Sequence, residues 1–585
     1  MTAVVDRPDR ASEAEPDQRT RTPSWLRSLW LHAFGLLVVL VALLPLIGAD
    51  SVFSADEGAA MIQVDVLDRT GRWSEASPFP LVDPQGERFG VHLSHQLDDG
   101  TFTYFGRRPA YTLALLAAAQ LGLGLAGAVG LSILGTVAAA SAAAHLTRHW
   151  RPNLDWVVLW VTGLLSPLAF NSYWVIAHAL AAGAVGWALV FLFGRRDRDP
   201  SRRATLAGGV LLLAAGMVRS EAVLFAIALA VAFLVVDLGL ERTPRPRFVI
   251  AGLAAAGGLL LNRLLASTLV GTIVGGASGI PSTESFGFFD GRVNALKATV
   301  LRVSPGGSQP IDFLLVLGIA VAAIGVVANR REPNARLFGR LAVVGASLAA
   351  ARFALDRETV VPGLAMAFPL LPIGVVALRP RHVAKPVGRI VALTSILFAG
   401  AVLLTQYDQG GTAEFGGRYF AVMLPALVPV LVVALADVGS AAPVDARVAW
   451  RVGVGVMAAA TVSMGLFGLH ASKARVSQLV AAERSAVQTV MAETGEPAVV
   501  LSTVNAVSRW SWDLYADTRW LIVAEEDLAA TATSLDRAGV SKFVVVGWGI
   551  DPDVTETLGA FERSDRTVAW AGSPWSVSIY AGGAA

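Results

Sequence analysis

Two adjacent carboxylates follow directly on the first long apolar run of the chain, in the segment "FSADEGAAM" at residues 53–61. A positioned carboxylate can act as a general base that takes a proton from a reacting hydroxyl group. The segment also fits a capping box, because Ser54 stands three residues before Glu57 at the start of a helical pattern. The capping box accounts for the presence of Glu57 at this position, and any role of Glu57 in substrate binding is secondary. Asp56 is not required by the cap, which makes it the candidate for such chemistry.

Basic and aromatic residues in short motifs elsewhere could hold an anionic leaving group beside such a base. The motifs are "RRPAY", "MVRSEAV", "GGRYFAVMLPAL" and the residue after "NSYWVIA". The candidate substrate-binding residues, with one further arginine at a helix end, are Arg107, Arg108, Tyr111, His178, Arg219, Glu221, Arg263, Arg418 and Tyr419.

Several of these residues have a simpler interpretation that the sequence leaves open. Arg219 and Glu221 could form a structural ion pair at a tight helical hairpin, and Arg263 could extend from a helix end to the membrane surface. Tyr173 and Trp174, next to His178, read as ordinary residues of the aromatic belt. The glycine pair before Arg418 allows the backbone to approach a ligand closely.

A metal site is possible but is not the preferred interpretation. The segment "HLSHQLDD" contains His92, His95, Asp98 and Asp99, which are residue types that bind divalent metals. Residues three apart on a strand face opposite sides, and Asp98-Asp99-Gly100 is more simply a hairpin turn. The chain has no cysteine, which excludes disulfides and thiolate ligands.

The composition requires these residues to be positioned by membrane helices. Of the 585 residues, 54% are hydrophobic and only 16% are charged, which is typical of an integral membrane protein with many spans. The net charge of +2 gives no support for nucleic-acid binding. We expect about 13 transmembrane helices, near residues 29–48, 123–144, 156–170, 179–193, 206–218, 222–236, 248–265, 313–327, 341–351, 361–378, 390–404, 420–436 and 452–467.

Every second loop between these spans is rich in arginine, as in "RRDRDPSRR" and "NRREPNAR", which predicts that these loops are cytoplasmic. We expect residues 1–28 to form a disordered cytoplasmic tail. An odd number of spans then places three regions on the outer side: residues 49–110, residues 271–311 and the chain after residue 470.

Two of the outward regions have patterns of their own. In the loop 49–110, Ala60, Met61, Val64 and Leu67 predict an amphipathic helix in the membrane interface, followed by a β-hairpin and a second interfacial helix from "RRPAY". In residues 471–585, the runs "PAVVLST", "RWLIV" and "KFVVVGWG" predict buried strands, and "EEDLAATATSLDRAG" predicts a helix. This order predicts a small α/β domain. No glycine-rich phosphate loop follows its first strand, so we do not expect nucleotide binding.

The order of the motifs resembles the GT-C superfamily of polyprenyl-phosphate-sugar glycosyltransferases, which includes protein O-mannosyltransferases and aminoarabinose transferases. The resemblance covers an outward Asp-Glu after the first span, the basic-Pro-x-Tyr stretch, the Arg-x-Glu at Arg219 and the Arg-Tyr at Arg418. It implies a polytopic α-helical membrane protein with a GT-C-like domain at residues 29–470 and a soluble extracytoplasmic α/β domain at 471–585.

The resemblance also implies a reaction. A sugar would move, with inversion, from a polyprenyl-phosphate donor to an extracytoplasmic glycan, lipid or protein acceptor, with Asp56 as the base and no redox cofactor. The protein would lie in the plasma (inner) membrane, in contact with its lipids. The alternatives are a transporter or lipid flippase, a cell-envelope polysaccharide ligase or polymerase, and a catalytically inactive scaffold whose terminal domain binds a cell-envelope partner.

Overall fold

The computed structural model describes most of the chain, and everything below refers to those residues. They are residues 28–48, 50–77, 79–91, 95–194, 199–242, 245–272, 288–307, 309–331, 335–405, 415–440, 442–549 and 556–582. His92 and the tail expected to be disordered lie outside the described residues, apart from Ser28 at the tail's end.

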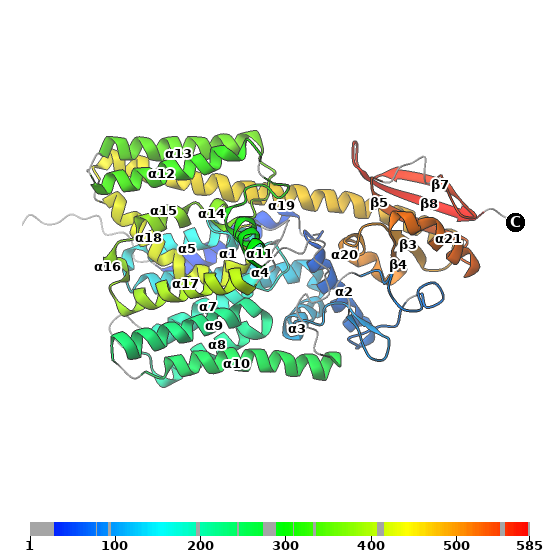
Figure 1. Ribbon diagram of the computed structural model, residues 1–585, viewed down its shortest axis with the longest axis horizontal. Coiled ribbons are helices and arrows are strands. Elements are labelled where there is room, and N and C mark those ends of the chain that lie inside the picture. The colour runs from blue at the N-terminus through cyan, green and yellow to red at the C-terminus, as the bar shows by residue number, and fades with distance from the viewer. Residues whose placement is uncertain are drawn as a thin grey trace, which may run out of the picture.

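A bundle of helices forms one end of the molecule, and a smaller domain containing a sheet forms the other (Figure 1). The main helices of the bundle run roughly parallel to its length, and they include both long and short elements. They are α1 (Leu29–Ile47), α4 (Gly124–Thr147), α5 (Asp155–Leu164), α7 (His178–Phe193), α8 (Arg202–Val218), α9 (Ser220–Phe233), α10 (Arg247–Leu265), α12 (Asp312–Arg331), α13 (Ala335–Leu355), α15 (Leu370–Ala377), α17 (Pro386–Thr405), α18 (Leu424–Ser440) and α19 (Val444–Thr494).

Nine helical segments among the described residues are long and apolar enough to cross a membrane, and α7 is a shorter apolar helix. The molecule is therefore a polytopic α-helical membrane protein with a terminal α/β domain. Each span expected from the sequence coincides with helical structure, but three of them fall on short or broken helices: α5 with α6 (Leu168–Asn171), α8, and α14 (Leu364–Ala367) with α15. The number of thirteen spans stays a prediction.

The terminal domain contains a six-stranded sheet with the strand order β4-β3-β5-β8-β7-β6. The three expected strands are present and pair in parallel: β3 (Ala498–Ser502), β4 (Thr518–Ile522) and β5 (Lys542–Trp548). Helix α21 (Leu528–Arg537) lies between β4 and β5 in the chain, as predicted. The sequence reading missed the antiparallel part, which consists of β6 (Thr557–Leu558), β7 (Phe561–Val568) and β8 (Trp575–Gly582).

Helix α19 joins the two parts of the molecule without a break. It is 51 residues long and runs from the bundle to the sheet (Figure 1), ending at Gly495, whose left-handed backbone terminates the helix. The boundary expected at residue 470 therefore falls inside a continuous helix.

The first outward loop lies between the bundle and the terminal domain. It contains α2 (Ala55–Thr70), the hairpin of β1 (His95–Gln96) and β2 (Phe102–Thr103), and α3 (Pro109–Ala118), which continues through a π-helical turn, Ala119–Leu123, into α4. The hairpin is the one predicted, with its turn at Asp98–Gly100.

The expectation that α2 lies in the membrane interface with a polar side free is wrong. One side of α2, with Ala60, Met61 and Val64, packs into the core of the bundle. The opposite side, with Ala59 and Ile62, packs into the core of the terminal domain. The helix is buried on both sides because it is held between two domains, not between lipid and water.

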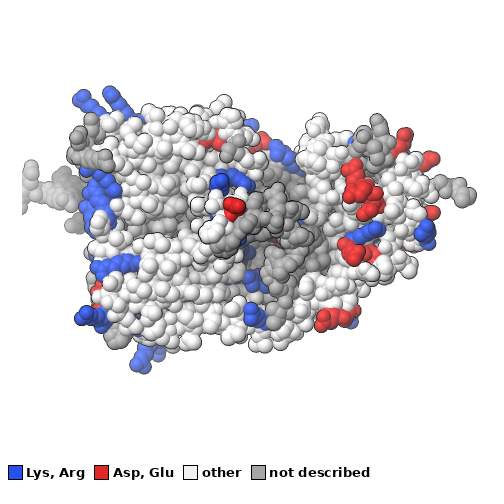
Figure 2. Space-filling model, in the orientation of Figure 1, with Lys and Arg blue, Asp and Glu red and all other residues white. Residues whose placement is uncertain are grey.

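Charge is distributed unevenly along the molecule. Lysine and arginine gather at the end of the bundle opposite the terminal domain, whereas acidic side chains gather on the terminal domain itself (Figure 2). The bundle between them carries almost no charge on the face shown. The basic end agrees with the arginine-rich loops noted in the sequence.

Candidate active site

Asp56 lies in the first turn of α2, which stands where the bundle meets the terminal domain (Figure 1). Its side chain is 38% exposed. One carboxylate oxygen, Oδ2, lies 3.5 Å from Nη1 of Arg418, and the other, Oδ1, lies 3.8 Å from Nη1 of Arg509. Both distances exceed an ordinary N–H···O hydrogen bond, so the carboxylate is oriented by charge and keeps lone pairs that can accept a proton.

Glu57 performs the structural role that the capping pattern predicts. Its Oε2 accepts hydrogen bonds from the backbone N–H groups of Phe53 and Ser54, at 2.7 and 2.6 Å. Its Oε1 accepts from the N–H of Val175, just before α7, at 2.7 Å. The side chain is completely buried, and burial raises the pKa of Glu57. Glu57 thus ties α2 to α7, and its role in substrate binding stays a prediction.

Arg418 is held by aromatic rings at the start of the 3₁₀ segment Arg418–Met423. Its guanidinium lies 5.4 Å from the ring centroid of Trp174 and 5.0 Å from that of Tyr419. Cation–π contacts of this kind hold the charged group in place, and Nη2 of Arg418 also donates to the Tyr419 hydroxyl at 3.2 Å. The aromatic-belt interpretation of Tyr173 and Trp174 is wrong, because both side chains are buried among helices. The Tyr173 hydroxyl donates to the Leu40 carbonyl, and the Trp174 indole donates to Ser54 Oγ.

The glycine pair before Arg418 has a packing function. Gly416 and Gly417 both have left-handed backbone angles, with φ of +64° and +57°. A Cβ on Gly416 would lie 2.4 Å from Pro167, and one on Gly417 would lie 2.5 Å from the Thr299 carbonyl oxygen. The close approach predicted from the sequence is therefore made to the protein itself, and it fixes the turn that presents Arg418.

Beside Arg418 lies a group of buried polar side chains whose hydrogen-bonding capacity is unused within the described residues. Neither ring nitrogen of His178 has a partner, although the side chain is only 1% exposed. The Tyr111 hydroxyl and both amide atoms of Asn171 are likewise without partners. His178 stacks on Trp174, with ring centroids 6.0 Å apart. Buried polar groups are normally hydrogen-bonded, so this group is arranged to receive a polar ligand or water.

Arg107 and Arg108 precede α3 and enter the same region. Arg107 interacts electrostatically with Asp56, while Arg108 faces Arg219 and Glu221. Burial, and after it the charge of Arg219, lower the pKa of the Arg108 guanidinium to about 10. Both groups remain protonated at neutral pH, and an anion would relieve their mutual repulsion.

Arg219 and Glu221 form the ion pair that was the simpler interpretation of their motif. Arg219 Nη2 lies 2.6 Å from Glu221 Oε1, and Nε lies 2.9 Å from Oε2, at the joint between α8 and α9. Glu221 is buried, whereas the Arg219 side chain is 18% exposed. The pair fixes the joint and leaves the guanidinium facing Arg108 and His178.

The structure thus brings together ten of the eleven predicted site residues around Asp56 and Arg219. The exception is Arg263, which is exposed on α10 and is not part of this cluster. A metal site receives no support, since no cluster of three potential His, Cys, Asp or Glu ligands occurs in the described part of the chain.

Sequence reasoning missed one arginine of the cluster. Arg509 belongs to α20 (Val507–Trp510) of the terminal domain and is 5% exposed. With it, five guanidinium groups (Arg107, Arg108, Arg219, Arg418 and Arg509) lie around two carboxylates, Asp56 and Glu221. The charged partner of Glu57 is the buried Lys473. The position of Arg509 directly after β3 was a usable signal, because α/β domains place functional residues beyond the carboxyl ends of parallel strands.

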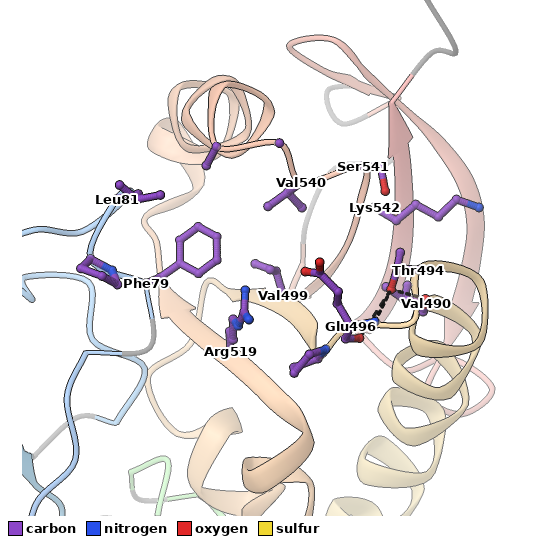
Figure 3. A pocket seen from close by; sticks show the side chains of 14 residues that line it. Phe79, Leu81, Val490, Thr494, Glu496, Val499, Arg519, Val540, Ser541 and Lys542 are labelled. Atoms are coloured by element: carbon purple, nitrogen blue, oxygen red, sulfur yellow. Dashed lines mark hydrogen bonds between the residues drawn. The ribbon is translucent and has the colours of Figure 1, made fainter.

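A separate groove of about 350 Å³ lies on the far side of the terminal domain (Figure 3). Phe79 of the first outward loop, Arg519 of β4 and Glu496 border it, with the Arg519 guanidinium 5.7 Å from the Phe79 ring centroid. It contains none of the predicted site residues.

Comparison with known proteins gives matches among solved structures. The chain is similar to ArnT from Cupriavidus metallidurans bound to undecaprenyl phosphate, at 17% sequence identity and a TM-score of 0.43, over 95% of this chain and 98% of that chain. It is also similar to the archaeal oligosaccharyltransferase AglB from Archaeoglobus fulgidus in complex with an inhibitory peptide and a dolichol-phosphate, at 12% identity and a TM-score of 0.44, over 89% and 69% of the two chains. ArnT and AglB are members of the GT-C superfamily. No protein-family model and no curated protein matches the chain.

Proposed function

We propose that this protein is a membrane glycosyltransferase of the GT-C type, which moves a sugar from a polyprenyl-phosphate donor to an acceptor hydroxyl outside the membrane. The observation that carries the proposal is the gathering of five buried or partly buried arginines around one accessible carboxylate, Asp56, and the Arg219–Glu221 pair. They lie at the end of the bundle next to the terminal domain, where a lipid-linked phosphate would arrive from the bilayer.

Asp56 is the general base in this mechanism. The acceptor hydroxyl attacks the anomeric carbon while its proton passes to a carboxylate oxygen of Asp56. The bond between the anomeric carbon and the phosphate oxygen breaks, and its electron pair leaves with the polyprenyl phosphate. Attack from the side opposite the leaving phosphate inverts the anomeric configuration.

The arginines and the unpartnered polar groups bind the departing phosphate. Negative charge grows on the phosphate as the glycosidic bond breaks, so fixed cations stabilise the transition state more than the ground state. Arg108 and Arg219 lie close to each other, with His178 and Tyr111 as neutral donors near Arg219.

The distribution of charge supports an orientation. The basic end of the bundle would face the cytoplasm by the positive-inside rule, which puts Asp56 and the terminal domain outside (Figure 2). The same distribution disfavours a transporter, which would place ionisable groups near the middle of the bilayer. Two strongly buried ion pairs of the bundle, Asp237–Arg247 and Asp312–Arg352, lie instead at helix ends.

The test compares the wild-type protein with Asp56→Asn, using purified protein, a panel of radiolabelled polyprenyl-phosphate sugars and a membrane extract as the source of acceptors. We expect a loss of transfer of about 10²- to 10⁴-fold, the usual contribution of a general base. Asp65→Asn is the matched control, because Asp65 lies on the same helix in an exposed pair with Arg69. Full activity of a folded Asp56→Asn variant would rule out Asp56 as the base.

A further inference from the structure

Arg509 comes from the terminal domain, not from the membrane bundle that holds the rest of the site. The chain leaves β3 at Ser502, turns through four residues and enters α20 at Val507. Within α20, Arg509 Nε donates to the Asn505 carbonyl oxygen at 3.3 Å, which directs the end of the guanidinium toward Asp56. The arginine therefore stands at the carboxyl end of the central parallel strand.

Close packing of α20 on α2 places the guanidinium. A Cβ on Gly58 would lie 1.6 Å from the Arg509 carbonyl oxygen, so only glycine permits this approach. Gly58 is two residues after Asp56, on the same turn of α2. The backbone contact at Gly58 and the ion pair at Asp56 thus belong to one junction between α2 and α20.

Further contacts hold the terminal domain in this position. The Ile522 N–H donates to the Arg88 carbonyl at 2.9 Å, and Phe89 pairs with Leu521 as an antiparallel extension of the sheet at β4. Ser508, next to Arg509, donates its hydroxyl to the Gly90 carbonyl. The junction is therefore a sheet extension and a helix contact, which define a single orientation of the domain.

We propose that the terminal domain completes the active site, with Arg509 as a positioning residue that holds the carboxylate of Asp56 for proton transfer. This inference rests on the proposed function. Arg418 from the bundle approaches one carboxylate oxygen and Arg509 from the terminal domain approaches the other, so Asp56 is held between the two parts of the molecule. Arg107 is the third cation that faces Asp56, and Glu57 is its acidic neighbour.

The role of Arg509 differs from that of the phosphate-binding arginines. Among the described residues, Arg509 interacts with Asp56 and with the carbonyl oxygen of Asn505 in its own backbone turn. It does not interact electrostatically with Arg219 or His178 there. Loss of Arg509 should therefore slow the chemical step and leave donor binding intact. Loss of a phosphate-binding arginine should weaken donor binding.

The experiment measures kcat and the donor KM for Arg509→Ala, with the radiolabelled donor that the wild-type protein accepts. We expect kcat to fall by at least tenfold, the donor KM to change by less than threefold, and methylguanidinium in the assay to restore part of kcat. The matched control is Arg484→Ala, because Arg484 forms a surface pair with Asp513 in the same domain. It should retain wild-type kcat.

Arg509→Lys keeps the positive charge, and it replaces Arg509→Ala in the experiment if the alanine variant does not fold. We expect it to retain more activity than a folded Arg509→Met variant of the same length. A folded Arg509→Ala or Arg509→Met variant with wild-type kcat would overturn the inference and leave the proposed function standing. A wild-type protein that transfers sugar from no donor in the panel would instead overturn the proposed function, and this inference with it.

Discussion

Substitution of Gly58 by alanine tests whether the terminal domain must be seated on α2 for the reaction to proceed. The new methyl group would lie 1.6 Å from the Arg509 carbonyl oxygen, whereas ordinary contacts begin at 3.4 Å, so α2 and α20 must separate by about 2 Å. If α20 moves, the distance from Asp56 to Arg509 increases, and if α2 moves, the distance from Asp56 to Arg418 changes as well. The substitution therefore disturbs the carboxylate without removing any charged group.

The size of the effect follows from the ion-pair distance. Moving Arg509 Nη1 from 3.8 Å to about 5.6 Å from Asp56 Oδ1 weakens the attraction by about 1.4 kcal/mol at an effective dielectric constant of about 20. Because the Asp56 side chain is partly exposed, solvent screening reduces this figure toward half. A restraint weaker by this amount leaves the productive orientation of the Asp56 carboxylate roughly three- to tenfold less populated, and we expect kcat to fall by the same factor.

Single-turnover transfer from a radiolabelled polyprenyl-phosphate sugar is the suitable assay, because it isolates the chemical step from product release. Gly130→Ala in α4 is the matched control, since its Cβ would meet no atom within 4 Å. Alanine is the better helix former by up to about 1 kcal/mol, so the control should be at least as stable as the wild type. A Gly58→Ala protein with unchanged single-turnover rate would refute the link between domain seating and proton transfer.

Three further predictions concern the surroundings of Asp56. Arg418→Lys should weaken binding of the proposed polyprenyl-phosphate donor by about tenfold or more, measured by thermal shift, because an ammonium group cannot reproduce the planar contacts with two rings; unchanged binding would exclude Arg418 from the phosphate site. The double variant Phe89→Cys/Leu521→Cys places two thiols at an antiparallel pair in a chain without other cysteines. Its oxidised form should transfer sugar at the rate of its reduced form, and inactivation on oxidation would mean that the domain must detach during turnover. Burial raises the pKa of Glu57, so the folded protein binds that proton more tightly than the unfolded chain, and stability should fall as pH rises from 4.5 through the folded-state pKa. The measurement is the unfolding temperature as a function of pH. Over this range it should fall less steeply for Glu57→Gln than for the wild type, and the same pH dependence in both proteins would contradict the assignment to Glu57.

Much of the architecture could be predicted because its signals are local. Apolar runs of membrane length and arginine-rich loops mark the bundle, and the apolar runs "AVVLS" and "KFVVVGW" mark the buried parallel strands. Strand β7 was not predicted because it reads "FERSDRTV", with polar side chains exposed along most of its length. The capping box at Ser54 to Glu57 was recognised for the same local reason.

The parts that could not be predicted depend on contacts between distant segments. The apolar face of α2 was assigned to lipid because a periodic pattern does not identify what covers it, and the second domain that covers the opposite face is about 450 residues away in the chain. The sequence signal for Arg509 is only its position after β3, and it does not show that the folded junction brings the side chain to Asp56. Trp174 was similarly misassigned, because aromatic residues near helix ends are common at membrane surfaces.

Because α19 is one continuous helix, the number of its residues between the bundle and the sheet sets the height and the rotation of the terminal domain. Each residue of a helix contributes a rotation of about 100° and a rise of about 1.5 Å. One residue inserted between the bundle and β3 would turn the sheet by that angle and carry α20 away from α2. Four inserted residues would restore the angle to within about 40° but raise the sheet by about 6 Å. The position of Arg509 at Asp56 therefore depends on the number of residues in α19 between the bundle and the sheet. Insertions or deletions in this part of α19 should reduce activity more than substitutions there.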